Sequence, residues 1–327
     1  MRETLTLIQA AAWIGQRKEG TNLAPGWLKH RGLLDVLRKT FLTIDDLPEL
    51  RETLLEEEDQ IFAEHFSARA YNFPSVAKYN RHLSTLVEEQ MNLLNFVLTV
   101  GGDHSIALGT LSGVLRANPN TKIIWVDAHT DINTPETSPS GNIHGMPLSF
   151  LMKLYQHPMT DEYLDFVPRL DPKNVIVIGA RDIDKGEVEL ITKTGMTVYT
   201  SKEVKAYGIE TVIKEARKKL DPYNKDPFHI SFDVDGIDPT YAPSTGTAVA
   251  GGLTLNEAKY LIEDVRRTGR LNSMDLVEIN PMLGTQEDLQ TTLDTTFSLI
   301  QSLKAPESKT KNDPNQQTAK KLPLNLN

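Results

Sequence analysis

Short apolar runs recur along the chain and alternate with stretches in which apolar residues return every three or four positions. The runs are rich in Val and Ile, and several are apolar almost throughout, which is typical of strands buried on both faces of a parallel sheet. We therefore predict strands at residues 5–11, 95–100, 122–128, 174–180, 196–200, 228–234 and 273–279.

The stretches between these runs carry the pattern of amphipathic helices. In one of them Thr254 is followed three residues later by Glu257, the arrangement of a capping box at the start of a helix. The helices are predicted at residues 105–117, 208–220, 254–269 and 285–303. Strands that alternate with helices predict an α/β fold, a three-layer α/β/α sandwich around a central, mostly parallel sheet.

The chain shows no internal repeat, and its length is ordinary for one α/β domain, so residues 1–304 are predicted to form a single domain. Residues 305–327 are polar and contain Pro and Lys, and we expect a flexible tail there. Residues 41–72 are acidic and less regular, and the run "LLEEEDQ" at 54–60 predicts a solvated turn or helix face.

Charge and cysteine usage exclude several classes of protein. The 327 residues carry a formal net charge of -9, which disfavours binding to nucleic acid or to an anionic membrane. The chain has no cysteine, so disulfides and thiolate metal sites are excluded, and any metal must be held by His and carboxylate side chains. The first apolar run, "LTLIQAAAWIG", is too short to span a membrane and lacks the basic start of a signal peptide. We therefore expect a cytoplasmic protein.

Three charged motifs follow predicted strands directly. They are "GGDHS" (101–105), "DAHTD" (127–131) and "DVDGIDP" (233–239). The carboxyl ends of strands in an open α/β sheet form its binding crevice, so the three motifs are expected to meet there. Within "DAHTD" the charged residues alternate, and alternate side chains of an extended chain point the same way.

The residue types in these motifs favour a metal site. The candidate ligands are two imidazoles and four carboxylates, His104, His129, Asp127, Asp131, Asp233 and Asp235. Four buried carboxylates would repel one another, and no basic residue in the motifs compensates, whereas two divalent cations would. Oxygen-rich ligands without sulfur favour Mn, Mg, Fe or Co over structural zinc. Taken singly, each motif also fits a turn or a helix cap, but their joint occurrence at strand ends favours the metal site.

At this point the chain resembles a known family. "GGDHS", "WVDAHTDINTP", "SGNIHGMPLSF", "SFDVDGIDP" and "VEINP" are similar to motifs of the arginase branch of the ureohydrolases, in order and from about residue 98 to residue 284. The metal motifs are shared by the whole superfamily, including agmatinases and formimidoylglutamases, whereas the loop "DINTPETSPSGNIHGMPLSF" is more specific and points to arginases. The resemblance implies an arginase/deacetylase-like fold, a homotrimer and a role in arginine metabolism such as the urea cycle.

The resemblance also implies the reaction and its metal. L-arginine and water would give L-ornithine and urea at a centre of two Mn2+ per subunit. One ion would be held by His104, Asp127, Asp131 and Asp233, and the other by Asp127, His129, Asp233 and Asp235. A hydroxide bridging the two ions would be the nucleophile, and Asp131 would also orient it.

The remaining roles concern the substrate. Glu278 could pair with a guanidinium group, which agrees with the family, although alone it would be a strand-end residue in a surface ion pair. His144 would move protons. The resemblance assigns the α-carboxylate of the substrate to four side chains that can hydrogen-bond to it, Asn133, Ser138, Ser140 and Asn142. It assigns the α-ammonium to Asp184 and Glu187, and one further substrate contact to Thr247. His229 is either a support for the metal ligands or a packed core residue.

Some positions differ from the usual sequence of the family. Lys18, Glu19 and Thr21 stand where a Gly-Gly or Gly-Val stretch is usual, Ala248 stands where Pro is frequent, Ser138 stands where Thr is common, and Pro139 lies inside the substrate loop.

Other functions are compatible with the same motifs. One alternative is a relative that acts on agmatine or another guanidino compound. Another is a metal-binding relative without catalysis. A nucleotide-binding protein is disfavoured because the G-x-G-x-x-G spacing and a Walker lysine are missing.

Overall fold

One sheet organises the protein. The computed structural model describes residues 4–51 and 69–304, and within them nine strands form one sheet in the order β2-β1-β4-β9-β8-β5-β6-β7, with β3 also paired to β1. Every strand pair is parallel. The strands are β1 (Thr4–Ala11), β2 (Thr43–Asp46), β3 (Leu50–Arg51), β4 (Phe96–Gly101), β5 (Lys122–Val126), β6 (Val175–Ala180), β7 (Thr197–Thr200), β8 (Phe228–Asp233) and β9 (Leu271–Val277).

Both faces of the central strands are buried, and successive residues of such a strand point to opposite faces. Ile124 and Val126 of β5 belong to one hydrophobic core, whereas Ile123 and Trp125 belong to the other. This double burial explains why the central strands read as almost continuous apolar runs. The predicted three-layer α/β/α sandwich is confirmed.

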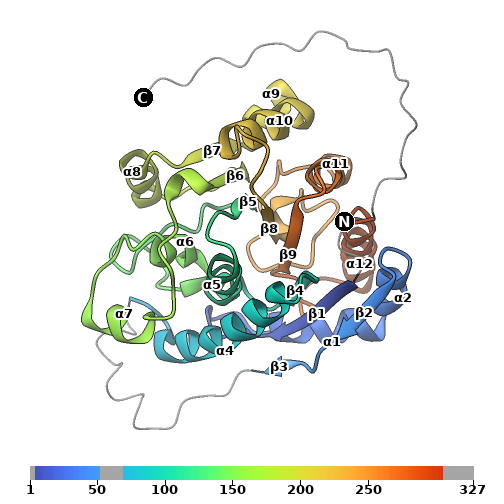
Figure 1. Ribbon diagram of the computed structural model, residues 1–327, viewed down its shortest axis with the longest axis horizontal. Coiled ribbons are helices and arrows are strands. Elements are labelled where there is room, and N and C mark those ends of the chain that lie inside the picture. Colours follow the sequence, from blue (N-terminus) through green and yellow to red (C-terminus); the bar gives the residue numbers. More distant parts are fainter. Residues whose placement is uncertain (1–3, 52–68, 305–327) are drawn as a thin grey trace.

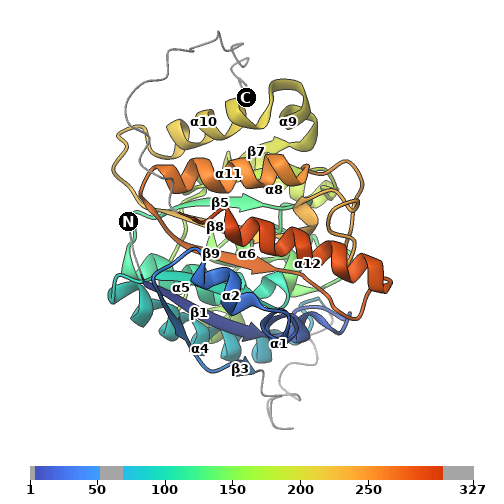
Figure 2. The ribbon, with the colours of Figure 1, turned by 90° about the vertical axis from the view of Figure 1, so that its right-hand side faces the viewer.

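Helices cover both faces, as Figure 1 shows. Figure 2 looks onto the face covered by α10, α11 and α12, together with α1 and α2, and α4 to α7 pack against the core of the opposite face. The helices are α1 (Ala24–His30), α2 (Leu33–Arg38), α4 (Phe73–Asn92), α5 (Ala107–Ala117), α6 (Pro147–Leu151), α7 (Pro158–Tyr163), α8 (Lys185–Thr194), α9 (Ser201–Tyr207), α10 (Ile209–Leu220), α11 (Leu255–Arg267) and α12 (Gln286–Gln301), with 3₁₀ turns η1 (Thr21–Leu23), η2 (His104–Ile106), η3 (Ile143–Gly145), η4 (Pro172–Asn174) and η5 (Val234–Gly236).

The predicted elements lie within two residues of the observed ones. The predicted capping box is confirmed: Thr254 Oγ1 accepts from the Glu257 amide at 3.2 Å, and Glu257 Oε2 accepts from the Thr254 amide at 2.8 Å. The edge strands β2 and β3 were not predicted, because they are short and largely exposed and so have no apolar run. The segment 54–60 and the tail 305–327 lie outside the described residues.

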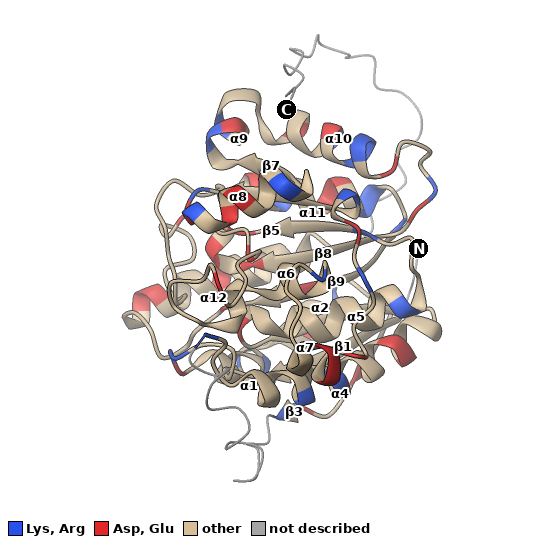
Figure 3. Ribbon diagram, turned by 90° about the vertical axis from the view of Figure 1, so that its left-hand side faces the viewer, with Lys and Arg blue, Asp and Glu red and all other residues tan. Residues whose placement is uncertain are grey.

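Acidic and basic positions are interspersed along α8, α9 and α10 in the view of Figure 3. Among the residues that the structure describes, no helix is both long and apolar enough to cross a lipid bilayer.

Candidate active site

The three charged motifs meet at the carboxyl ends of the strands, as predicted. They follow β4, β5 and β8, which run in the same direction and therefore end on the same side of the sheet. Residues after β1, β6 and β9 reach the same place. This is the binding crevice expected at the carboxyl ends of parallel strands.

The expectation that "DAHTD" is extended is wrong. Strand β5 ends at Val126, and the motif forms a bend in which the Asp127 carboxylate accepts a hydrogen bond from the His129 amide at 2.7 Å. Asp131 has a φ of 48°, in the left-handed region that Asp tolerates better than most residues. The side chains thus converge because the backbone turns, and not because of strand alternation.

One group of candidate ligands surrounds the His104 ring. Its Nδ1 lies 3.1 Å from Asp127 Oδ2, 3.1 Å from Asp131 Oδ2 and 3.4 Å from Asp233 Oδ2. All of these side chains are almost completely buried. One imidazole nitrogen and three carboxylate oxygens this close together form a donor set that fits a cation.

A second group adjoins the first. His129 Nδ1 lies 3.3 Å from Asp127 Oδ1 and 3.2 Å from Asp235 Oδ2. His104, Asp127 and Asp131 can hold one ion and Asp127, His129 and Asp235 another, so that Asp127 is common to both sets. The donor set therefore fits two neighbouring cations that share a carboxylate.

The charges in this cluster are unbalanced in the protein alone. Burial and the neighbouring Asp127 charge raise the pKa of Asp131 to about 7. Burial and nearby carboxylates also raise the pKa of Asp233 and of Asp235. Burial opposes the charged form of His104 as well, but its hydrogen bonds to the carboxylates outweigh this effect and raise its pKa. Such a cluster is stable in its ionised form only when cations compensate it.

Two side chains that sequence reasoning missed support the ligands. Ser231 Oγ lies 2.9 Å from His104 Nε2, and Trp125 Nε1 donates to Asp127 Oδ2 at 2.9 Å while its ring stacks on His104 at a centroid distance of 4.0 Å. Fixing the second nitrogen of a ligand histidine is a common support at metal sites. Strand parity with Asp127 and Asp233 could have found both residues.

Glu278 lies at the base of the site and is buried. Its Oε1 accepts from the His104 amide at 2.9 Å and from His144 Nδ1 at 2.8 Å, and its Oε2 accepts from Gln16 Nε2 at 2.9 Å. Burial alone would raise the pKa of Glu278, but His144 and these hydrogen bonds lower it. The φ of 64° is unusual for a residue with a side chain, and such strain is concentrated at functional sites. The reading of Glu278 as a surface ion pair is excluded by its burial.

The glycine of the first motif lets two strand ends approach closely. A Cβ atom added to Gly102 would lie 1.9 Å from the Ala12 carbonyl oxygen. The Gly102 carbonyl in turn accepts from the Glu278 amide at 2.9 Å. Only glycine fits there, and its approach joins β1, β4 and β9 beneath the site.

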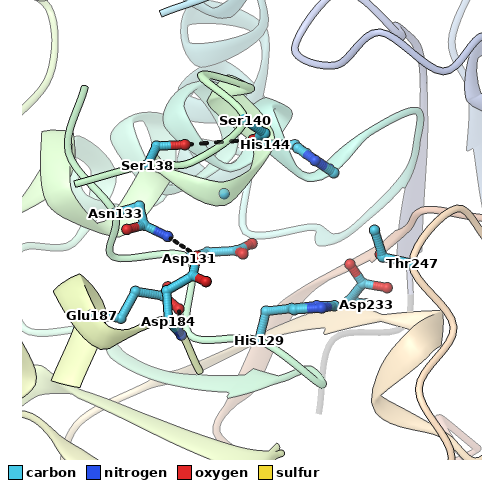
Figure 4. Close-up of a pocket in the computed structure, with 11 residues that line it drawn as sticks. His129, Asp131, Asn133, Ser138, Ser140, His144, Asp184, Glu187, Asp233 and Thr247 are labelled. Carbon is cyan, nitrogen blue, oxygen red and sulfur yellow. Dashed lines mark hydrogen bonds between the residues drawn. The ribbon is translucent and has the colours of Figure 1, made fainter. Parts of the chain in front are cut away.

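An open pocket lies above the candidate ligands (Figure 4). His144 faces it, and the Glu278 carboxylate outweighs the effect of burial on this histidine, raising its pKa to about 9. The pocket is lined by His129, Asp131, Asn133, Ser138, Ser140, His144, Gly145, Asp184, Glu187, Asp233 and Thr247. The structure thus brings most of the predicted substrate-binding residues to one cavity beside the candidate metal ligands.

Several of these residues also hold the pocket together. Asn133 Nδ2 donates to Asp184 Oδ2 at 2.9 Å. Both Glu187 oxygens are engaged, since Oε1 accepts from Thr130 Oγ1 at 2.8 Å and Oε2 accepts from the Asp184 amide at 2.9 Å. The predicted ammonium-binding carboxylates are therefore fixed in place by the fold.

Three predicted residues are placed differently from the rest. Glu278 is almost completely buried beneath the pocket and is not among its lining residues. Thr247 lines the pocket, but its hydroxyl donates to Asp235 Oδ2 at 2.7 Å and so contacts a candidate metal ligand. Asn142 is not among the pocket-lining residues, and its Oδ1 accepts from Arg17 at 2.8 Å.

His229 is a core residue, the second of its two predicted readings. It is completely buried, its Nδ1 lies 2.9 Å from Ser273 Oγ, and its Nε2 lies 3.3 Å from Asp275 Oδ2. Its contacts are with β9 and not with the candidate metal ligands.

Comparison with known proteins relates this site to characterised relatives. The sequence model of the Arginase family matches residues 8–304. The arginase of Schizosaccharomyces pombe is 36% identical over 290 residues, 88% of each chain. The crystal structure of arginase from Bacillus subtilis superposes with a TM-score of 0.81 at 34% identity, covering 93% of this chain and 99% of that one. The structure of Entamoeba histolytica arginase in complex with L-ornithine superposes with a TM-score of 0.80 at 33% identity, over 91% and 98%.

Proposed function

The chain belongs to the arginase family, and from this premise we propose that it hydrolyses L-arginine to L-ornithine and urea at a centre of two Mn2+. The observation that carries the proposal is the pair of adjoining ligand groups that share Asp127, at the base of a pocket lined by hydrogen-bonding side chains. A structure of a relative in complex with L-ornithine supports the class of substrate.

The residues present fit a pair of divalent cations. His104, Asp127, Asp131 and Asp233 would hold one Mn2+, and Asp127, His129, Asp233 and Asp235 the other. When bound, the two ions would supply a hydroxide nucleophile near neutral pH and balance the carboxylate charge. Asp131 would also accept a hydrogen bond from the nucleophile, because its carboxylate lines the pocket.

Glu278 and His144 would act on the guanidinium group. The Glu278 carboxylate is buried and has a lowered pKa, so it stays ionised and can pair with a planar cation. His144 donates from Nδ1 to this carboxylate, which leaves Nε2 to deliver a proton to the leaving amine or to take one from the product.

The pocket rim would select the amino-acid end of the substrate. Asn133, Ser138 and Ser140 offer uncharged hydrogen-bonding groups for the α-carboxylate. Asp184 and Glu187 offer carboxylates for the α-ammonium. Asn142 lies outside the pocket lining and would support the carboxylate-binding residues from there, and Thr247 would act mainly through Asp235.

We also propose the domain organisation, the location and the assembly of the protein. Residues 1–304 form one domain, which is supported by the single sheet that joins the described strands. We place the protein in the cytoplasm on the basis of its sequence alone. We propose a homotrimer on the basis of the resemblance to arginases.

Urea release by the Mn2+-loaded protein tests the function. We expect strong preference for L-arginine over agmatine, which lacks the carboxylate that the pocket rim would bind. Equal or greater activity on agmatine would reassign the chain to another ureohydrolase specificity and refute the proposed role of the rim.

A further inference from the structure

A short segment after β1 holds the substrate side of the pocket together. The Gly15 carbonyl accepts from the His144 amide at 3.1 Å. Gln16 Nε2 donates to Glu278 Oε2 at 2.9 Å, and Lys18 Nζ donates to the Gly246 carbonyl at 2.5 Å. Gly15, Gln16 and Lys18 therefore each contact a different part of the site, and Arg17 contacts a fourth part.

Arg17 binds the back of residues 138–142, which we name the carboxylate loop. Its Nη1 donates to the Ser140 carbonyl at 2.6 Å and to Asn142 Oδ1 at 2.8 Å. Its guanidinium lies over the Tyr71 ring, 4.6 Å from the centroid, and the Tyr71 amide donates to the Gly141 carbonyl at 2.7 Å. One arginine and its stacking partner thus hold successive residues of the loop from outside.

The carboxylate loop needs such support because it belongs to no helix or strand. Gly141 has a φ of 69°, which permits the turn. The Gly141 amide donates to Ser138 Oγ at 3.0 Å, and the Asn142 amide donates to Ser140 Oγ at 3.1 Å. Each serine hydroxyl therefore accepts a hydrogen bond within the loop. The two hydroxyls also lie 3.5 Å apart, where either can donate to the other, so at least one serine proton stays available for an anionic group in the pocket.

We propose that Arg17 is a positioning residue for the carboxylate loop and thereby determines selectivity for guanidino substrates that carry an α-carboxylate. Arg17 does not line the pocket, so it acts through Ser140 and Asn142. Its positive charge behind the loop favours an anion and disfavours a cationic amine at the same place. The inference rests on the proposed function of this pocket.

The test compares Arg17→Met and Arg17→Lys with the Mn2+-loaded wild-type protein. For Arg17→Met we expect KM for L-arginine to rise about tenfold, which corresponds to about 1.4 kcal/mol, with kcat unchanged within about twofold. KM for agmatine should stay unchanged or fall by up to about twofold, because agmatine has no carboxylate to misplace and its ammonium group is no longer opposed by the Arg17 charge. Arg17→Lys should recover most of the loss, since both hydrogen bonds come from one nitrogen that an ammonium can replace.

Arg31→Met is the matched control. Arg31 is also exposed and lies over an aromatic ring, that of Trp27 at 4.8 Å, but it is not part of the pocket. An unchanged KM for L-arginine in Arg17→Met would overturn the proposal. So would equal rises for L-arginine and agmatine, failure of Arg17→Lys to recover, or the same effect in Arg31→Met.

Failure of the proposed function would look different. In that case the wild-type protein binds Mn2+ but releases no urea from L-arginine. The role of Arg17 is then decided by calorimetric titration with L-ornithine, which has the carboxylate, and putrescine, which lacks it. Weaker binding of L-ornithine alone to Arg17→Met supports the proposal, and unchanged binding overturns it.

Discussion

Replacing Glu278 by Gln removes one buried charge and leaves the packing in place. The side chain has nearly the same shape, its Oε1 can still accept from His104 and His144, and the new amide faces Gln16, whose own amide can turn to accept it. Repulsion with the buried Asp103 is relieved, since the Glu278 charge is one reason that the pKa of Asp103 is raised to about 6, after burial. Loss of the ion pair with His144 opposes this relief, so we expect the free energy of unfolding of the metal-free variant to fall by about 1 kcal/mol.

The effect on turnover should be large by comparison. If Glu278 pairs with the guanidinium group, the variant leaves a cation facing a neutral amide in a buried site, which typically costs about 2–5 kcal/mol. That range corresponds to a fall in kcat/KM for L-arginine of about thirtyfold to about five-thousandfold.

Steady-state urea release, with bound Mn2+ counted on the same samples, is the assay. The variant should keep its metal, because Glu278 is not in either ligand group. Asp221→Asn is the control, since Asp221 is also a buried carboxylate but lies before β8, at the opposite edge of the sheet. A Glu278→Gln protein with full metal and an unchanged kcat/KM would refute the anchor role. Loss of metal together with activity would refute its placement outside the ligand set.

Three other predictions test the metal centre, an acid-sensitive pair and the packing beneath the site. Asp127→Ala should lower turnover more than about a hundredfold and reduce the Mn2+ retained after gel filtration, because both ligand groups use this side chain; retention of two ions per chain would contradict the shared role. Burial alone would raise the pKa of Asp221, but hydrogen bonds from Arg270 and backbone amides lower it. A carboxylate with a lowered pKa stabilises the fold above its unfolded pKa of about 3.9 and loses this effect as the pH falls through its folded pKa. Asp221→Asn should therefore reduce Tm at pH 7, and this deficit should shrink progressively as the pH falls below about 3.9; a constant deficit would contradict this assignment. Gly102→Ala should reduce the free energy of unfolding in urea by about 3 kcal/mol, because its Cβ would overlap the Ala12 carbonyl, and an unchanged midpoint would show that the strand ends can separate.

The central strands could be predicted because burial on both faces makes them apolar throughout. Helix α4 (Phe73–Asn92) could not, because its buried face includes polar side chains whose partners are distant in sequence. Asn80 Oδ1 accepts from the Gly109 amide at 2.8 Å, and Gln90 Oε1 accepts from Thr6 at 3.1 Å. Such residues interrupt the apolar periodicity that identifies a helix.

The candidate metal ligands could be predicted because parallel strands bring their carboxyl ends together, and carboxylates placed there need a cation. The bend in "DAHTD" could not, since it depends on a local turn and on the left-handed conformation of Asp131. The contacts of Gln16 and Arg17 with Glu278 and Ser140 join residues more than a hundred positions apart, and no local pattern in the segment after β1 indicates them.

We propose that the pocket of this arginase binds the α-carboxylate and the α-ammonium of L-arginine as well as its guanidinium group. The most direct measurement is the initial rate of urea release by the Mn2+-loaded protein, with L-arginine and agmatine compared side by side. We expect L-arginine to be strongly preferred. Equal or faster release from agmatine, or no release from either substrate with Mn2+ bound, would contradict it.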